Sequence, residues 1–222
     1  MLSTISLYPT NLIEYTNPLA EHLNVEIERY LRKEREDSPN LPSFSSRGNT
    51  AWHSFDNLTE LQEDWSVALK QMIYDVSDRY HMGLQQGRHL PGLEQIRIKC
   101  WALILGQHDY SNYHTHPNSD ISGVYWVKNP PVLPENEGRF SVPDPRGGAQ
   151  ASRLQGSAMY YHPPVEGTGL VFPSWLPHYV EPHYQEGERI SISWNLFIKD
   201  PPEGTVNIAS SSWRDTNGDN WG

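Results

Sequence analysis

The most constraining feature of this sequence is the segment RISISWNLFIK at residues 189–199, because its side chains alternate strictly between apolar and polar. In a β-strand, successive side chains point to opposite faces of the sheet. Ile190, Ile192, Trp194, Leu196 and Ile198 therefore share one face, and Arg189, Ser191, Ser193 and Asn195 share the other. The segment predicts a long strand that buries one face and presents a polar face either to solvent or to an interior pocket.

A second long strand with the same two-residue period is predicted where the pattern changes after Gly92, with Ile96, Ile98, Cys100 and Ala102 on one face. Shorter strands are expected at 121–128, 157–161, 168–172 and 178–182, each bounded by turn residues. The 18 prolines and 16 glycines are too many for a helical bundle. The sequence therefore predicts a mainly β sandwich or barrel.

Two amphipathic helices are predicted within the first 92 residues. The first is expected to start at Asn17 and Pro18, with an apolar stripe at helical spacing: Leu19, Leu23, Ile27, Tyr30 and Leu31. The second is expected to be capped by Asn57, with a stripe from Leu58 to Tyr80. We expect one domain overall: a helical region at 1–92 packing on a β core at 93–200, followed by a loosely packed tail at 201–222.

Composition narrows the functional classes. The formal charge of −10 argues against nucleic-acid binding by phosphate neutralisation, although a small anion held by a buried arginine remains compatible with it. The single cysteine, Cys100, excludes an intramolecular disulfide and fits a reducing compartment, so a cytoplasmic protein is expected. No apolar run approaches the length of a membrane span, and no signal peptide is recognised.

Three histidines form a candidate metal site. His114 and His116 are two residues apart, so on a strand both imidazoles point to the same face and can share one ion. A third ligand must come from elsewhere, and His178, after a proline-bounded turn, is the best candidate. His183 is expected on the opposite face if its strand is regular. Chance clustering of satisfied histidines is the alternative, because such a pair alone is a weak signal.

Arg189 and Ser191 form a candidate anion site. An arginine and a serine two residues apart on a strand can hold a carboxylate, with the guanidinium forming two parallel hydrogen bonds and the hydroxyl adding a further donor. The pair lies eleven residues after the third candidate metal ligand. The alternative is an ordinary polar face turned toward solvent.

The order of these motifs resembles the 2-oxoglutarate/Fe(II)-dependent oxygenase superfamily. The stretches HTHPNSDISGVYWV, FPSWLPHYVEP and RISISWN are most similar to a branch of microbial and phage oxygenases with the pattern HxHPxSxxSGVYYV, FPSWLxHxVxP and RxSxSxN. The similarity covers about residues 96–199. It implies a double-stranded β-helix core, a cupin-like jelly roll, with Fe(II) bound at one open end.

The resemblance also implies 2-oxoglutarate as co-substrate, chelating the iron through its keto-acid end while its other carboxylate pairs with Arg189 and Ser191. Tyr125 is a further expected donor to 2-oxoglutarate. Trp126, Trp175 and Asn195 are expected to line the substrate pocket, with Trp194 as another candidate wall. Plain core packing is the alternative for the tryptophans.

This chain departs from the superfamily at one position, because His116 stands where the usual HxD motif has a carboxylate. Three arrangements are open: three histidine ligands; two histidines and a water; or a carboxylate folded in from Asp120 or Asp109. We favour three histidines, since their i, i+2 spacing brings two ligands to one ion most simply.

The expected function is that of an Fe(II)/2-oxoglutarate-dependent dioxygenase that hydroxylates an unidentified small molecule or peptide and releases succinate and CO2. Two alternatives stay open: a three-histidine cupin-type metalloenzyme that does not use 2-oxoglutarate, and a non-enzymatic jelly-roll binding or structural module. The sequence does not indicate the substrate or the oligomeric state.

Overall fold

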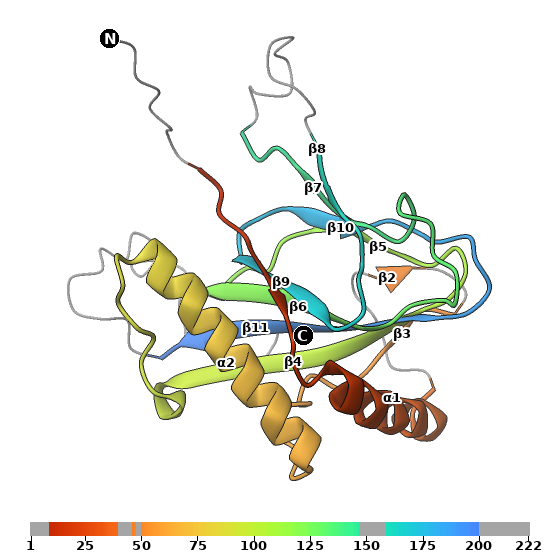
Figure 1. The fold of residues 1–222 in the computed structure, drawn as a ribbon, viewed down its shortest axis with the longest axis horizontal. Helices are drawn as coiled ribbons and strands as arrows, with labels where there is room; N and C mark the ends of the chain where they lie inside the picture. The colour runs from red at the N-terminus through yellow and green to blue at the C-terminus, as the bar shows by residue number, and fades with distance from the viewer. Residues whose placement is uncertain (1–8, 40–45, 48–49, 147–158, 200–222) are drawn as a thin grey trace.

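The computed structural model describes residues 9–39, 46–47, 50–146 and 159–199, and its two antiparallel β-sheets face each other (Figure 1). The six-stranded sheet has the order β1-β9-β6-β11-β4-β3, and the five-stranded sheet has the order β2-β5-β10-β7-β8. The strands of the first are β1 (Ile13–Thr16), β3 (Trp52–His53), β4 (Ile96–Leu105), β6 (Ile121–Lys128), β9 (Thr168–Pro173) and β11 (Arg189–Ile198). Those of the second are β2 (Ser46–Arg47), β5 (Tyr110–His114), β7 (Phe140–Pro143), β8 (Met159–His162) and β10 (His178–Val180).

The pair β4 and β11 forms the centre of the larger sheet. All ten residues of β11 pair with β4 in unbroken register, from Arg189 opposite Leu105 to Ile198 opposite Ile96. On its other side, β11 pairs with β6. The predicted mainly β architecture with flanking helices is confirmed, and so are both long alternating strands.

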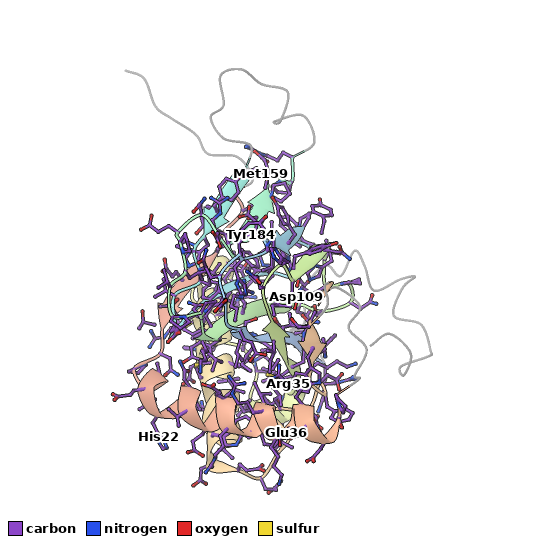
Figure 2. All side chains as sticks on the ribbon, turned by 90° about the vertical axis from the view of Figure 1, so that its right-hand side faces the viewer. His22, Arg35, Glu36, Asp109, Met159 and Tyr184 are labelled. Carbon is purple, nitrogen blue, oxygen red and sulfur yellow. The ribbon has the colours of Figure 1, made fainter. Side chains whose placement is uncertain are left out.

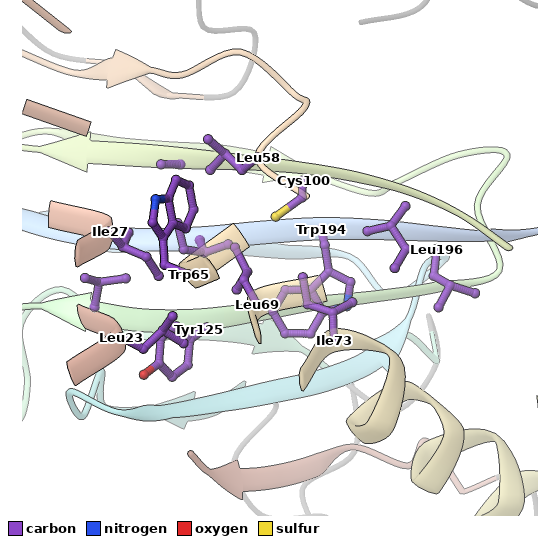
Figure 3. Packing of buried hydrophobic residues seen from close by; sticks show 14 of the residues in the cluster. Leu23, Ile27, Leu58, Trp65, Leu69, Ile73, Cys100, Tyr125, Trp194 and Leu196 are labelled. Atoms are coloured by element: carbon purple, nitrogen blue, oxygen red, sulfur yellow. The ribbon is translucent and has the colours of Figure 1, made fainter. Parts of the chain in front are cut away.

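Both helices cover the outer face of the six-stranded sheet: α1 (Ala20–Asp37) and α2 (Asp64–Leu84) lie on one side of it, and the five-stranded sheet lies on the other (Figure 1). The main core fills the layer between helices and sheet, where Leu23 and Ile27 of α1 and Leu69 of α2 meet the apolar face of β11 (Figure 3). This face includes Trp194 and Leu196, both inaccessible to solvent. A second cluster lies between the two sheets: Val124, Trp126, Phe140, Val142, Leu170, Phe172 and Leu176.

Both helices start later than predicted. In α1 the first helical residue is Ala20, because the Asn17 carboxamide oxygen accepts the amide of Leu19 and forms a turn before the helix. Leu23, Ile27 and Leu31 are buried as expected, but Leu19 is 63% exposed.

In α2 the first helical residue is Asp64, seven residues after the predicted cap Asn57. Residues 56–58 instead bind β4: the amide of Leu58 donates to Cys100, and the amide of Cys100 donates to Asp56. Leu58 is still fully buried, so its place in the core was predicted correctly although its helical state was not. Tertiary pairing overrode the local capping signal.

The N-terminal region also supplies strands that the sequence analysis did not predict. β1 pairs with β9 at one edge of the larger sheet, and β3 pairs with β4 at the other. Of the strand predicted at 157–161, β8 accounts for the part that is described, while residues 157–158 and the tail at 201–222 lie outside the described residues.

Two ion-paired positions fasten α1 to the sheet. Arg32 and Arg35 both contact Glu188 at 3.0 and 2.7 Å, immediately before β11. Glu28 contacts Lys128 at 2.6 Å, at the end of β6. Because these groups are partly exposed, their contribution to stability is small, and their main effect is to fix where α1 lies along the sheet.

Two glycines give a matched test of this packing. A Cβ at Gly123 on β6 would overlap the indole of Trp194 and lie 2.8 Å from the carbonyl oxygen of Leu170, whereas a Cβ at Gly83 in α2 meets nothing within 4 Å. We expect Gly123→Ala to lower the free energy of unfolding by about 2 kcal/mol or more, because the sheet backbone has to move. Gly83→Ala should raise it by about 0.5–1 kcal/mol, because alanine favours helix. Urea denaturation of both variants checks this; equal effects would contradict the packing described.

Candidate metal centre and anion pocket

His114 and His178 are brought together by strand pairing. His114 is the last residue of β5, and it lies directly opposite His178, the first residue of β10. The two ring centroids are 4.4 Å apart. Neighbouring short strands of the five-stranded sheet therefore hold two imidazoles on one face, at the place where both strands meet loops.

His116 lies just beyond β5, and its backbone is held from both sides. Its amide donates to the carbonyl of Ser174 at 2.9 Å, and its own carbonyl accepts the hydroxyl of Ser119 at 2.9 Å. The intervening Pro117–Asn118 turn places Asn118 at φ 65°, a backbone conformation that asparagine tolerates well. The turn directs the His116 ring back toward the other two.

The three imidazoles form one cluster. Their potential ligand atoms all lie within 4.8 Å of one another, and Nε2 of His116 is 3.3 Å from Nε2 of His178. Two nitrogens bound to one ion at about 2.1 Å lie roughly 3.0–3.4 Å apart for octahedral to tetrahedral angles. The observed separation fits a shared ion, and the predicted convergence of the three rings is confirmed.

Backbone carbonyls orient two of the rings. Nδ1 of His114 lies 2.6 Å from the carbonyl oxygen of Asn112, and Nδ1 of His178 lies 2.9 Å from that of Leu176. A carbonyl can only accept, so each Nδ1 carries the proton and each Nε2 keeps its lone pair. Metal-binding histidines are commonly fixed in this way, with the remote ring nitrogen donating to a backbone carbonyl.

The electrostatic setting keeps the rings neutral and able to bind a cation. Burial, and then the neighbouring His114, lower the pKa of His116 to about 3. Burial also lowers the pKa of His114, and burial with the two neighbouring rings lowers that of His178 well below its ordinary value. All three are therefore unprotonated at neutral pH, which is the form that binds a metal.

Aromatic side chains surround the cluster on the inner faces of both sheets. Phe140 and Phe172 pack against His178 with centroids 4.8 and 4.9 Å away, and Trp101 packs against His116 at 5.9 Å. Sequence reasoning did not assign these three residues to the site. Each of the three lies next to a residue that points to the opposite face of its strand: Cys100, Ser141 and Val171. This alternation assigns the three aromatic residues to the inner face only if it is already known which face of each strand points inward.

The two alternative carboxylates have other partners. The Asp109 carboxylate accepts the hydroxyl of Thr50 at 2.5 Å and the amide of Gly106 at 2.9 Å. The Asp120 carboxylate accepts the amide of Ile198 at 2.7 Å, at the end of β11. The cluster contains three imidazoles and neither carboxylate. The idea that Asp109 or Asp120 completes the site is therefore wrong in this structure, because backbone and hydroxyl donors hold both groups elsewhere.

Arg189 is a charged residue in an apolar, buried position. Its side chain is 1% exposed, and Nη1 donates to the carbonyl of Gly138, but no carboxylate pairs with it among the described residues and its Nε has no hydrogen-bond partner there. Burial lowers its pKa to about 10. A buried charge without a counter-ion is costly, so this arrangement fits a bound anion.

Ser191 belongs to the same pocket by position. It lies on the same face of β11 as Arg189, is fully buried, and its hydroxyl also lacks a partner in the described part of the chain. Three or more donors from a guanidinium and a hydroxyl suit a carboxylate. The orphaned Nε and Oγ show that the residues present fit the distal carboxylate of a dicarboxylic acid.

A short segment links the pocket to the cluster. Gly138 accepts the hydrogen bond of Arg189, and Phe140, two residues later, stacks on His178. Two residues of chain span at most about 7 Å, so the segment from Gly138 to Phe140 brings Arg189 close to the imidazole cluster.

Tyr125 does not face this cavity, so its expected role is wrong. It is on the helix side of β6, beside Leu23 and Ile27 of α1 (Figure 3), and its hydroxyl donates to the Asn24 side chain at 2.6 Å and accepts from Asn17 at 3.2 Å. Adjacent strand residues point to opposite faces, so Tyr125 and Trp126 could not both reach the interior.

The other expected pocket residues divide into two groups. Trp126 lies between the sheets, fully buried, and stacks on His162 at 5.1 Å; Asn195 is on the inner face of β11 and accepts the hydroxyl of Ser122 at 2.8 Å. Trp175, by contrast, is 55% exposed on the turn before Leu176, and Trp194 is in the helix-side core. Trp194 therefore lies outside the layer between the sheets and is no pocket wall, whereas a pocket role for exposed Trp175 stays a prediction.

Part of the chain is similar to a known protein family. Residues 99–195 match a protein-family model described as "Putative 2OG-Fe(II) oxygenase", which confirms the resemblance noted from the motifs. A search of curated proteins gave no match.

Solved structures share the double-stranded β-helix fold. A prolyl-4-hydroxylase from Pseudomonas putida superposes with a TM-score of 0.57 at 15% identity, covering 86% of this chain and 94% of that one. HygX from Streptomyces hygroscopicus, solved with nickel and 2-oxoglutarate, gives 0.56 at 10%, covering 85% and 83%. The α-ketoglutarate-dependent epimerase SnoN gives 0.56 at 14%, covering 85% and 78%. At such identities the likeness establishes the fold alone, and it confirms the jelly-roll expectation.

Neither helix in the described part of the chain has the length and apolar character needed to cross a membrane.

The buried neutral imidazoles predict how stability depends on pH. The folded-state pKa of His116 is lowered to about 3, so between its unfolded value of 6.5 and that pH the unfolded chain binds more protons than the folded one. The metal-free protein should therefore lose stability as the pH falls below about 6.5. We expect His116→Gln to flatten this dependence in urea denaturation followed across pH. His22→Gln, at an exposed position on α1 (Figure 2), should leave it unchanged, and an equal effect of both would contradict this explanation.

Proposed function

We propose that this protein is an Fe(II)- and 2-oxoglutarate-dependent dioxygenase with a three-histidine metal site. The observation that carries the proposal is Arg189, a fully buried guanidinium without a carboxylate partner among the described residues, placed one short segment away from three converging imidazoles. A metal site alone fits many enzymes. A metal site beside a pocket built for a carboxylate fits a co-substrate that chelates at one end and is anchored at the other.

His114, His116 and His178 would hold the iron through their Nε2 lone pairs. When bound, iron with 2-oxoglutarate supplies oxygen activation coupled to decarboxylation, giving succinate and CO2. The protein contributes geometry: Asn112 and Leu176 fix the rings, while Arg189 and Ser191 orient the dicarboxylate along the cavity. The proposed reaction on the second substrate is hydroxylation of a small molecule or peptide.

The residues around the cluster also restrict water. Phe140 and Phe172 are almost completely buried and pack directly against His178, so they exclude water from that side of the cluster. A dry site strengthens each charge–dipole interaction and protects reactive species from side reactions. The polar inner face of β11, with Asn195 held by Ser122, provides the hydrogen-bonding side of the same cavity.

A three-histidine cupin that does not use 2-oxoglutarate is the main competing enzyme class. Such a site has no need for an arginine at position 189. Burying one there without a counter-ion would lower the stability of the fold and would serve no ligand. The buried and unpaired Arg189 therefore supports the 2-oxoglutarate reading over this alternative. It equally disfavours a purely structural module.

Co-substrate consumption tests the function directly. Purified protein with Fe(II), 2-oxoglutarate and oxygen should release succinate even without the second substrate, at a slow uncoupled rate. His114→Ala should abolish this release because one of three metal ligands is lost, while its circular dichroism spectrum stays unchanged. His22→Ala, on the exposed face of α1, is the control. Two outcomes would contradict the proposal. One is equal succinate release by the wild type and the His114 variant, and the other is no succinate release by the wild type either with or without candidate second substrates.

Arg189→Met separates binding from folding. In the wild type, 2-oxoglutarate with Mn(II) should raise the melting temperature, and this increase should disappear in the variant. The ligand-free variant should lose no more than about 1 kcal/mol, the value of its hydrogen bond to Gly138, since no ion pair is broken. Removing one partner of a buried ion pair would instead cost about 3–5 kcal/mol. A loss of that size, or a retained ligand-induced shift, would show that Arg189 is not the anion clamp.

A further inference from the structure

His183 is a buried histidine close to Arg189, separate from the three-histidine cluster. It is 1% exposed, and its Nε2 lies 3.2 Å from the carbonyl oxygen of Leu105. Nδ1 is buried and has no hydrogen-bond partner in the part of the chain that the structure describes. The five-residue spacing predicts His183 on the face opposite His178 in a regular strand, but β10 ends at Val180, so this alternation does not reach His183.

The backbone places His183 next to Arg189. Leu105, which accepts from His183, is the register partner of Arg189. Gly138 links the two side chains: its carbonyl accepts Nη1 of Arg189, its amide donates to Pro182, and a Cβ on it would be 3.8 Å from both Arg189 Cδ and His183 Cβ. Gly138 has φ +61°, a backbone conformation that favours glycine, at the turn that both side chains contact.

The hydrogen-bond pattern defines what Nδ1 can do. A carbonyl only accepts, so the His183 Nε2 that faces Leu105 carries a proton. In the neutral ring, Nδ1 is then a lone pair, and with a second proton it becomes a donor. A carboxylate bound beside a protonated Nδ1 would form a charge-assisted hydrogen bond with it.

We propose that His183 is a third member of the anion pocket, and that its Nδ1 takes up a proton and donates to the distal carboxylate when the dicarboxylate binds. The inference rests on the proposed function and deepens it: co-substrate binding is coupled to proton uptake. Three buried polar atoms without partners among the described residues then find one ligand, namely Arg189 Nε, Ser191 Oγ and His183 Nδ1.

The other charged groups near this end of the cavity have their own partners. Asp109 is held by Thr50 and Gly106, and Glu137 accepts the amide of Tyr184 and the side chain of Gln185. Glu181 pairs with Arg139 at 2.7 Å, and the ring of His108, an exposed residue, packs on Tyr184. Arg189 is thus the charge that His183 meets inside the pocket, and an incoming carboxylate is the group that changes its surroundings.

Calorimetry on the metal-loaded protein tests the proposal. Mn(II) replaces Fe(II) so that no turnover occurs, and 2-oxoglutarate is titrated at one pH in two buffers with different ionisation enthalpies, which gives the number of protons taken up. The wild type should take up part of a proton near neutral pH, and its affinity should fall as the pH is raised from about 6 to about 8.5. His183→Gln keeps a donor for Leu105 but cannot add a proton. It should bind about tenfold more weakly at the lower pH, with no proton uptake.

The matched control is His162→Gln. His162 is also a buried histidine whose Nε2 has no hydrogen-bond partner among the described residues, but it stacks on Trp126, contacts Tyr160 and lies 3.8 Å from the Glu14 carboxylate. This variant should retain the wild-type proton uptake. His183→Asn provides a second variant if the glutamine variant does not fold, and it too should show no uptake.

The outcomes separate the two proposals. No 2-oxoglutarate binding by the wild type would overturn the proposed function. Wild-type binding without proton uptake, or with uptake that persists in the His183 variants, would overturn the role of His183 and leave the proposed function standing.

Discussion

The pairing of β11 with β4 and β6 is the constraint on which the rest of this structure depends. Ten consecutive residues of β11 alternate between two environments, and the register with β4 is unbroken along their whole length. One face, with Ile192 and Trp194, meets the helices and closes the main core. The other presents Arg189 and Ser191 to the interior. A slip by one residue would put the guanidinium into the apolar layer and the indole into the cavity, so the core and the anion pocket specify the same register.

Much of this arrangement could be read from the sequence, because local patterns carried it. The alternation at 189–199 gave the strand and both its faces, and the spacing of His114 and His116 with a distant His178 gave the cluster. The errors came from longer-range effects. Asn57 has the chemistry of a helix cap, but pairing with Cys100 removes it from the helix. Tyr125 and Trp126 alternate visibly, yet nothing local says which of them faces inward. His183 and Arg189 are adjacent only because Gly138 lies between them.

The charge balance of the cavity follows from its ligands. Three neutral imidazoles leave a divalent ion with its full charge, whereas a carboxylate ligand would reduce it by one. If 2-oxoglutarate binds as proposed, one of its carboxylates would meet the ion and reduce its charge by one, and the other would neutralise Arg189. This makes metal and co-substrate mutually dependent: each is held more firmly when the other is present. The aromatic residues Phe140 and Phe172 strengthen that coupling, because they keep the dielectric constant around the site low.

The ion pairs between α1 and Glu188 place further charges at the protein surface, next to the buried Arg189. Glu188 is bonded through one peptide link to Arg189, and its partners Arg32 and Arg35 are 39% and 29% exposed. Charges that solvent reaches are weakened by dissolved ions, whose screening length is about 8 Å at physiological ionic strength. The start of β11 is therefore sensitive to salt, even though the guanidinium beside it is sealed from water.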